Sequence, residues 1–312
     1  RRIWPTERMV MMGSERSGSS RARRPHRHHR RHRHRAKGSH TVLWLIVIVL
    51  IVFGGGWMLL RGAGDGPSSP VPTTATAPPT LVQRLTIPEG LRREEIAALV
   101  GRETTFSRDR YLRLTGPGAR GRALAGTGRP TSLEGFLFPA TYDIYSDTTV
   151  ADLVTMQLDA FADNTAGIDL SRARRKNLTP YDVLIIASMI EREVAVPAER
   201  RLAPSVIYNR LKAGMSLGID ATVQYAIGSW KPDLTVSELN IDSPYNTRRF
   251  TGLPPGPISN PGRASIEAAA DPADTGYLYY VARNDGSGSH YFARDAAQFE
   301  RDVQRARANG GR

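Results

Sequence analysis

Two glutamates, Glu191 and Glu193, lie at the end of a long apolar segment, where a carboxyl group can act as an acid. Thr179-Pro180-Tyr181-Asp182 predicts a helix start, because Thr can cap the helix, Pro suits its first position and Asp follows the cap by three residues. The next residues, VLIIASMIEREV, are apolar on nearly every side, so the helix should be buried. Burial raises the pKa of a carboxyl group, which can then stay protonated near neutral pH and serve as a general acid.

Helix geometry separates these two carboxyl groups. Residues two apart differ by about 200° around the helix axis, so Glu191 and Glu193 must face opposite sides. At most one of them can enter a given pocket. The pattern alone favours a non-catalytic alternative, in which both are exposed or paired with Arg192, Arg200 or Arg201.

Polar and aromatic residues in expected loops are further candidates. Glu134 opens the block Glu134-Gly135-Phe136-Leu137-Phe138-Pro139, whose aromatic rings either line a sugar groove or pack in a buried hairpin. Residues 243–262, which include Tyr245 and Asn246, are too polar and too rich in Gly and Pro for a helix or strand. Long ordered loops are usually functional, and these side chains suit hydrogen bonding and stacking with an oligosaccharide.

The Cys and His content of the sequence gives little support for metal or cofactor chemistry. The chain has no cysteine, which excludes disulfides, Cys-ligated zinc, iron–sulfur clusters and thiol catalysis. Six of the seven His residues lie between His26 and His40, so His290 is alone in the rest of the chain and is expected to be structural. We expect no cofactor and no metal.

The elements that must position these candidates define an α+β fold. Alternating apolar residues predict a strand over residues 81–87, and a helical pattern follows over residues 91–100. Another helix is expected over residues 264–270, followed by strands over residues 277–281 and 289–292.

The chain before residue 81 has three parts. Residues 1–40 form a basic His/Arg-rich tail with thirteen Lys and Arg but two Glu, whereas residues 41–312 are nearly neutral, with 30 basic and 28 acidic residues. The basic excess therefore lies on a low-complexity tail and does not predict nucleic-acid binding. Residues 41–60 carry no charge and are long enough for a transmembrane helix, and residues 61–80 form a Pro/Thr-rich linker.

The charges around this apolar segment predict its orientation. Many basic residues precede it and only Arg61 directly follows it, which places the tail in the cytoplasm and the C-terminal body outside. A cleaved signal peptide is the alternative, but the length and the lack of a clear Ala-x-Ala site favour a single-pass anchor in the cell membrane. Because the sequence begins with Arg1, we expect translation to start at Met9, Met11 or Met12.

Seven blocks of the body follow one another in a distinctive order: Glu134-Gly135-Phe136-Leu137-Phe138-Pro139, Ala187-Ser188-Met189-Ile190-Glu191-Arg192-Glu193, Tyr208-Asn209-Arg210-Leu211, Asp220 with Thr222-Val223, Ser243-Pro244-Tyr245-Asn246-Thr247, residues 252–262 and residues 277–290. With these blocks, the body resembles the MltG (YceG-like) family of endolytic murein transglycosylases. The resemblance covers residues 81–301 and implies a shortened LysM-like subdomain over residues 81–130 and an α+β catalytic domain over residues 131–312.

This resemblance implies an enzyme that cuts nascent peptidoglycan strands between MurNAc and GlcNAc and so terminates their elongation. Glu193 matches the family's acid/base, with Glu191 in reserve. It would protonate the glycosidic oxygen and take the proton of the MurNAc C6 hydroxyl, which closes a 1,6-anhydro ring. The expected partners are glycan strands and cell-wall synthases in the membrane, and the expected sugar-positioning residues are Glu134, Asp220, Tyr245 and Asn246.

The chain departs from the family at two places. Where the family has a polar pair followed by Asp-Pro-Thr-Val, this chain has Gly218-Ile219-Asp220-Ala221-Thr222-Val223, which lacks a polar contact and a turn proline. The family also has a longer LysM-like region than residues 81–130. Two alternatives therefore stay open: a hydrolytic muramidase that leaves reducing ends, and a non-catalytic peptidoglycan-binding scaffold.

Overall fold

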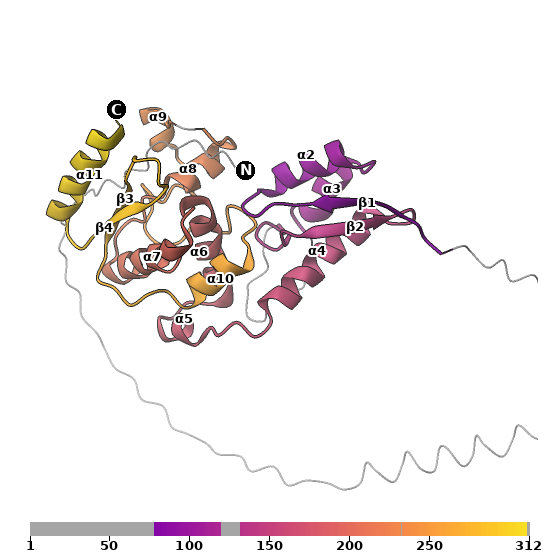
Figure 1. Ribbon diagram of the computed structural model, residues 1–312, viewed down its shortest axis with the longest axis horizontal. Coiled ribbons are helices and arrows are strands. Elements are labelled where there is room, and N and C mark those ends of the chain that lie inside the picture. Colours follow the sequence, from indigo (N-terminus) through magenta and orange to yellow (C-terminus); the bar gives the residue numbers. More distant parts are fainter. Residues whose placement is uncertain (1–77, 120–131, 232, 311–312) are drawn as a thin grey trace, which may run out of the picture. The chain divides into compact units, whose positions relative to one another are not determined.

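An antiparallel two-stranded sheet organises the first part of the fold. In this computed structural model, which describes residues 78–119, 132–231 and 233–310, β1 (Leu81–Thr86) pairs with β2 (Thr141–Tyr145) (Figure 1). The helices of this group are α2 (Arg93–Glu103), α3 (Arg108–Thr115) and α4 (Val150–Thr165). They bury one apolar cluster with the sheet, which includes Leu85, Ile96, Val100, Tyr111, Ile144 and Leu153.

The strand pairing crosses residue 130, where the resemblance implies a division of the chain. β2 lies after that boundary, yet it supplies the hydrogen-bonding partner of β1. α4 follows β2 and adds Leu153 and Val154 to the same apolar cluster. A lone strand pattern indicates no partner, so a pairing over this sequence distance cannot be read from it. The N-terminal group therefore extends through α4.

The second group surrounds one buried helix, α6 (Pro180–Glu193). A capping box starts this helix as the sequence predicts: the Thr179 hydroxyl accepts the Asp182 N–H at 3.1 Å and the Asp182 carboxylate accepts the Thr179 N–H at 2.7 Å. All residues from 183 to 190 are buried. The other elements of this group are α5 (Ser171–Arg175), η1 (Pro197–Glu199), α7 (Leu202–Ala213), α8 (Asp220–Ile227), α9 (Val236–Leu239), α10 (Arg263–Ala270), β3 (Tyr279–Ala282), β4 (His290–Ala293) and α11 (Ala296–Gly310).

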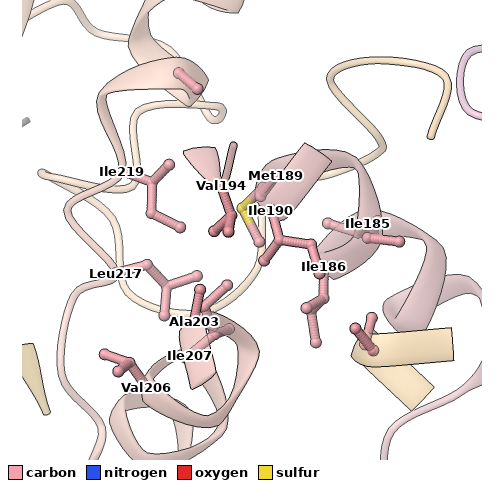
Figure 2. Packing of buried hydrophobic residues seen from close by; sticks show 14 of the residues in the cluster. Ile185, Ile186, Met189, Ile190, Val194, Ala203, Val206, Ile207, Leu217 and Ile219 are labelled. Carbon is pink, nitrogen blue, oxygen red and sulfur yellow. The ribbon is translucent and has the colours of Figure 1, made fainter. Parts of the chain in front are cut away.

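Apolar packing fixes the end of α6 against α7 and the chain before α8. Figure 2 shows Met189 and Ile190 of α6 in one cluster with Ile207 of α7 and with Leu217 and Ile219. Each of these five side chains is almost fully buried. Close packing of this kind leaves little freedom for rotation, so the last turn of α6 is held in place.

The two C-terminal strands form an antiparallel pair in which Tyr280 lies opposite Phe292. α11 packs against both strands. The strands begin and end within two residues of the limits expected from the sequence, and the expected α+β class is confirmed.

Within the described ranges, no helix is both long and apolar enough to cross a bilayer. The expected basic tail, the expected transmembrane helix and almost all of the expected linker fall in residues 1–77, which lie outside those ranges. The membrane anchor therefore stays an expectation from the sequence.

The turn before β2 places its aromatic rings in the core, which is the buried alternative. The Phe136 ring centroid lies 5.2 Å from that of Phe161, and Phe138 is also buried. Gly135 has φ 88°, and a Cβ there would lie 2.6 Å from Cγ of Pro257. Because Gly135 has no side chain, the loop before α10 (residues 240–262) can pack directly on this turn.

We predict that Gly135→Ala lowers the free energy of unfolding by about 2–4 kcal/mol, because the new Cβ adds a clash with Pro257 to the cost of a positive φ. Gly167→Ala is the matched control, since Gly167 has φ 77° and open space around it. It should cost about 1 kcal/mol. Urea denaturation followed by circular dichroism measures both, and equal losses would contradict the close packing at Pro257.

Candidate active site

Glu193 is the last residue of α6, and its two carboxyl oxygens have different surroundings. Oε2 accepts a hydrogen bond from the Tyr280 hydroxyl of β3 at 3.3 Å. Oε1 is buried and has no hydrogen-bond partner within the protein. Because a buried polar atom without a partner is costly, Oε1 is the carboxyl oxygen with unused hydrogen-bonding capacity.

The surroundings of Glu193 favour its neutral form. Burial raises the pKa of this carboxyl group to about 8, and the negative charge of Asp220 adds to the increase. The hydrogen bond from Tyr280, the nearby backbone N–H of Ala221 and the charge of Arg192 act in the opposite direction. Glu193 is therefore protonated at neutral pH, as a general acid must be.

Asp220, the first residue of α8, brings a second carboxyl group close to Glu193. It forms an ion pair with Arg248, from the loop before α10, at 2.5 Å, and both side chains are mostly buried. Burial raises the pKa of Asp220, whereas the charge and the hydrogen bond of Arg248 oppose this increase. The loop residue Arg248 thus limits the effect of Asp220 on Glu193.

Glu191 contacts a different part of the protein, as helical periodicity predicts. Its Oε2 accepts the backbone N–H of Gly262, at the start of α10, at 3.1 Å. Burial raises the pKa of Glu191, and nearby Glu89 acts in the same direction. The two glutamates at the end of α6 therefore do not share a pocket, and Glu193 alone contacts Tyr280.

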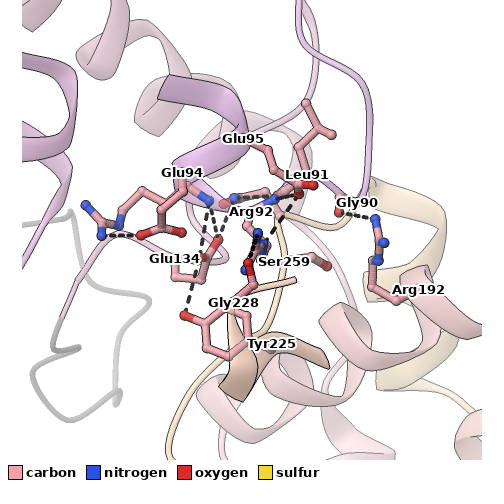
Figure 3. A network of polar contacts seen from close by, with 12 residues as sticks. Gly90, Leu91, Arg92, Glu94, Glu95, Glu134, Arg192, Tyr225, Gly228 and Ser259 are labelled. Carbon is pink, nitrogen blue, oxygen red and sulfur yellow. Dashed lines mark hydrogen bonds and ion pairs between the residues drawn. The ribbon is translucent and has the colours of Figure 1, made fainter. Parts of the chain in front are cut away.

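Glu134 is fully enclosed where the two groups of elements meet. Its carboxyl group accepts hydrogen bonds from the Arg93 backbone N–H at 3.1 Å and from Asn260 Nδ2 at 2.8 Å. The Tyr225 hydroxyl approaches it at 3.4 Å (Figure 3). Burial raises the pKa of Glu134 to about 8. Through these contacts Glu134 connects α2, α8 and the loop before α10. Its contact with a sugar stays a prediction.

Contacts of Arg192 hold the C-terminal end of α6 in the same region. The Arg192 guanidinium lies 3.7 Å from the centroid of the Trp230 ring and donates to the Gly90 carbonyl at 3.0 Å. Arg92 donates in the other direction, to the Gly228 carbonyl at 3.1 Å, as Figure 3 shows. The Arg192–Gly90 hydrogen bond thus connects the turn before α2 with the residue next to Glu193, and Trp230 stacks on the same guanidinium.

The remaining sequence candidates lie in the loop before α10. The Tyr245 ring lies 4.8 Å from the Tyr225 ring, and the Tyr245 side chain is partly exposed. Asn246 is fully buried: its amide nitrogen donates to the Leu239 and Ile241 carbonyls, and its amide oxygen accepts the Arg248 backbone N–H. Asn246 therefore shapes the loop that carries Arg248, and its contact with a sugar stays a prediction.

Sequence analysis does not single out Tyr280 or Arg248, although both lie in segments that it marks. A signal for Tyr280 exists, because residues alternate across an expected strand and Tyr280 falls on one face of it. A signal for Arg248 is the single acidic residue Asp220 in an otherwise uncharged block. Neither signal indicates that Tyr280 contacts Glu193 or that Arg248 acts on Glu193 through Asp220.

No group of three or more His, Cys, Asp or Glu that could hold a metal ion occurs in the part of the chain that the structure describes. His290 lies in β4 and is buried, and its Nδ1 pairs with Glu199 Oε2 at 2.8 Å. Its backbone N–H also donates to Glu199 at 2.9 Å. His290 thus has a structural role in this arrangement.

These features define an α+β protein whose central helix ends in a carboxyl group, that of Glu193, with a raised pKa. The chain belongs to the YceG-like family, whose model matches residues 72–305. The crystal structure of a YceG-like protein from Listeria monocytogenes is similar, with a TM-score of 0.62 and 32% identity over 70% of this chain and 75% of that one.

Curated relatives carry one shared name. The endolytic murein transglycosylase of Bacillus subtilis (strain 168) is 35% identical over 216 residues, which is 65% of this chain and 60% of the relative. The endolytic murein transglycosylase of Streptococcus pneumoniae (strain R6) is 32% identical over 268 residues, which is 78% of this chain and 46% of the relative. The chain thus spans about half the length of these relatives.

We predict that Glu193→Gln changes how stability depends on pH. With a pKa of about 8 in the folded state, against an ordinary value of 4.5, Glu193 binds more protons when folded, so its contribution to stability is lost as pH rises from about 5 to 8. Relative to the wild type, the variant should gain about 2 kcal/mol or more between pH 5 and pH 9. Urea denaturation at each pH measures this gain.

The matched control is Glu300→Gln, on the exposed surface of α11. It should keep the pH dependence of the wild type. A constant difference between Glu193→Gln and the wild type at all pH values would show that the Glu193 carboxyl group is ionised in the folded protein at neutral pH.

Proposed function

We propose that this chain is an endolytic murein lytic transglycosylase that cuts the MurNAc–GlcNAc bond of nascent glycan strands and leaves 1,6-anhydro-MurNAc ends. The observation that carries the proposal is the Glu193 carboxyl group, whose buried Oε1 has no partner within the protein and whose pKa is raised to about 8. Membership of the YceG-like family and the names of the curated relatives support the substrate class.

The proposed reaction needs one carboxyl group. The proton on Glu193 Oε1 moves to the glycosidic oxygen as the bond from that oxygen to C1 of MurNAc breaks. The C6 hydroxyl oxygen of the same MurNAc forms the new bond to C1, and its proton returns to the Glu193 carboxylate. Atoms and charges balance without water, so the second carboxylate that ordinary glycosidases use for water or a covalent intermediate is not required.

The residues around Glu193 would serve its two roles in turn. A raised pKa favours the first step, in which Glu193 gives up its proton, because the proton is present at neutral pH. The second step needs a carboxylate that can be reprotonated, and a pKa near the working pH suits both directions. The charge of Asp220, which Arg248 partly balances, is one contribution to that pKa.

We place the contacts with the glycan on the loop before α10. Tyr245 offers a partly exposed ring there, and Asp220 acts on Glu193 from the start of α8. Glu134 and Asn246 are buried and hydrogen bonded within the protein. They would act on the glycan by fixing this loop.

We expect Glu193→Gln to reduce cleavage by about 10²–10⁴-fold, because the amide has no proton of suitable acidity to donate. Glu191→Gln is the matched control from the same helical turn, and it should keep cleavage because Glu191 contacts Gly262. Mass spectrometry of uncrosslinked glycan strands after incubation with each protein measures the loss of intact strands and the new ends.

Three outcomes would contradict parts of this proposal. Cleavage by Glu193→Gln at the wild-type rate would exclude Glu193 as the acid. Reducing ends in place of anhydro ends would indicate a hydrolytic muramidase. Intact strands with a folded wild-type protein, also in the presence of membrane extracts, would support a non-catalytic scaffold.

The proposed location is the cell membrane, with residues 1–40 in the cytoplasm, residues 41–60 as a single-pass helix and the folded body outside. The basic residues before the apolar segment support this orientation. Glycan strands under synthesis lie on the outer side, so cell-wall synthases in the same membrane are the proposed partners.

The absence of cysteine allows a direct test of this topology. In intact cells, a membrane-impermeant maleimide should label Glu300→Cys but not Ser39→Cys, and it should label both after permeabilisation. Labelling of Ser39→Cys in intact cells would contradict the orientation. Loss of residues 1–60 from the purified protein, measured by intact mass, would instead show a cleaved signal peptide.

A further inference from the structure

Tyr280 contacts the Glu193 carboxyl group from a strand 87 residues further along the chain. Its side chain is 1% exposed, and its hydroxyl donates to Oε2 of Glu193 at 3.3 Å. The opposite oxygen, Oε1, has no partner within the protein. The two oxygens of the proposed acid are therefore not equivalent.

We propose that Tyr280 is a positioning residue for Glu193: its hydroxyl holds Oε2, so that Oε1 carries the proton to the glycosidic oxygen, and it stabilises the carboxylate that remains. This inference rests on the proposed function, which it deepens. It assigns a role to a buried hydroxyl group that the acid/base scheme of Glu193 alone does not use.

The length of the hydrogen bond is consistent with a role late in proton transfer. A hydroxyl that donates to a carboxylate lies about 2.5–2.7 Å from it, and such a charge-assisted bond is about twice as strong as a neutral one. The 3.3 Å contact is longer than this, so it can shorten and strengthen as the carboxylate forms. An interaction that strengthens towards the transition state accelerates the reaction.

Tyr280 is the donor in its hydrogen bond with Glu193. Burial, and next the charge of Glu193, raise the pKa of the Tyr280 hydroxyl well above its ordinary value. The phenol therefore keeps its proton over the working pH range and does not compete with the glycosidic oxygen as a base. Its proton stays on the tyrosine while the proton on Oε1 moves to the substrate.

The Tyr280 ring is fixed by two neighbours from β4. The His290 ring meets it edge-on, with centroids 5.4 Å apart at 88°, and the Phe292 ring lies 5.8 Å away. His290 is itself held by two hydrogen bonds to Glu199, at 2.8 and 2.9 Å. This packing keeps the hydroxyl directed at Glu193 and gives the lone histidine of the body a supporting role.

The charged groups around Glu193 and Tyr280 come from several elements. Asp220 faces them from α8, Arg192 from α6 and Arg210 from α7. Arg248 acts through its ion pair with Asp220, and the pair of Glu199 and His290 lies behind the ring. A variant that removes only the Tyr280 hydroxyl leaves all of these groups in place, so a change in titration reports on the hydroxyl.

The test is Tyr280→Phe in the full chain, because this change removes the hydroxyl and keeps the ring packing. We expect kcat on uncrosslinked glycan strands to fall by about 10–100-fold with little change in KM. Because the hydroxyl favours the carboxylate form, its loss should also move the pKa of Glu193, and the basic limb of the kcat profile, to higher pH.

Tyr279→Phe is the matched control from the adjacent strand position. The Tyr279 ring stacks on Phe299 with centroids 5.1 Å apart, and adjacent strand residues point to opposite faces. This variant should keep the kcat and the pH profile of the wild type. If Tyr280→Phe also keeps both, the proposal is overturned.

A titration without substrate separates this inference from the proposed function. Carboxyl ¹³C resonances of labelled glutamate, with Glu193→Gln to assign the Glu193 signal, should move to a higher midpoint pH in Tyr280→Phe. An unchanged midpoint would overturn the role of Tyr280 even if the chain cleaves glycan. A moved midpoint in a chain that cleaves no glycan would instead contradict the proposed function.

A second variant covers the case in which Tyr280→Phe does not fold. Fluorotyrosine at position 280 keeps the shape of the side chain and makes its hydroxyl a stronger donor. The Glu193 midpoint should then move to lower pH, opposite to the effect of Tyr280→Phe. A midpoint equal to that of the wild type would contradict the proposal.

Discussion

The burial of one carboxyl group between the ends of two helices is the constraint on which this site depends. Glu193 closes α6, whose C-terminal end carries a partial negative charge, and it faces the start of α8, where the Ala221 N–H favours a negative charge. Burial outweighs the favourable contacts and raises the pKa of Glu193 to about 8. A carboxyl group with this pKa can release a proton and recover it near neutral pH.

The surrounding elements keep that carboxyl group in place. Apolar packing of α6 against α7 fixes the helix, and the stacking of Arg192 on Trp230 fixes its last turn. β3 supplies Tyr280 and the loop before α10 supplies Arg248 through its ion pair with Asp220. The fold thus brings a helix, a strand and a loop, which are far apart in the sequence, to one carboxyl group.

Local patterns predict the elements of this site better than their contacts. Thr179 and Pro180 indicate where α6 begins, and helical periodicity separates Glu191 from Glu193, because capping and rotation depend on neighbouring residues. The contact of Tyr280 with Glu193 depends on tertiary packing over 87 residues, which no local pattern encodes. The pairing of β1 with β2 is hidden for the same reason.

The same burial that raises the pKa of Glu193 also limits the access of bulk water, which suits the proposed attack by the substrate's own C6 hydroxyl. Cleavage of glycan strands in H₂¹⁸O tests this central claim most directly. The account predicts 1,6-anhydro-MurNAc ends that contain no ¹⁸O, made by the wild type and not by Glu193→Gln. Reducing MurNAc ends that carry ¹⁸O would contradict it, because water would then be the nucleophile.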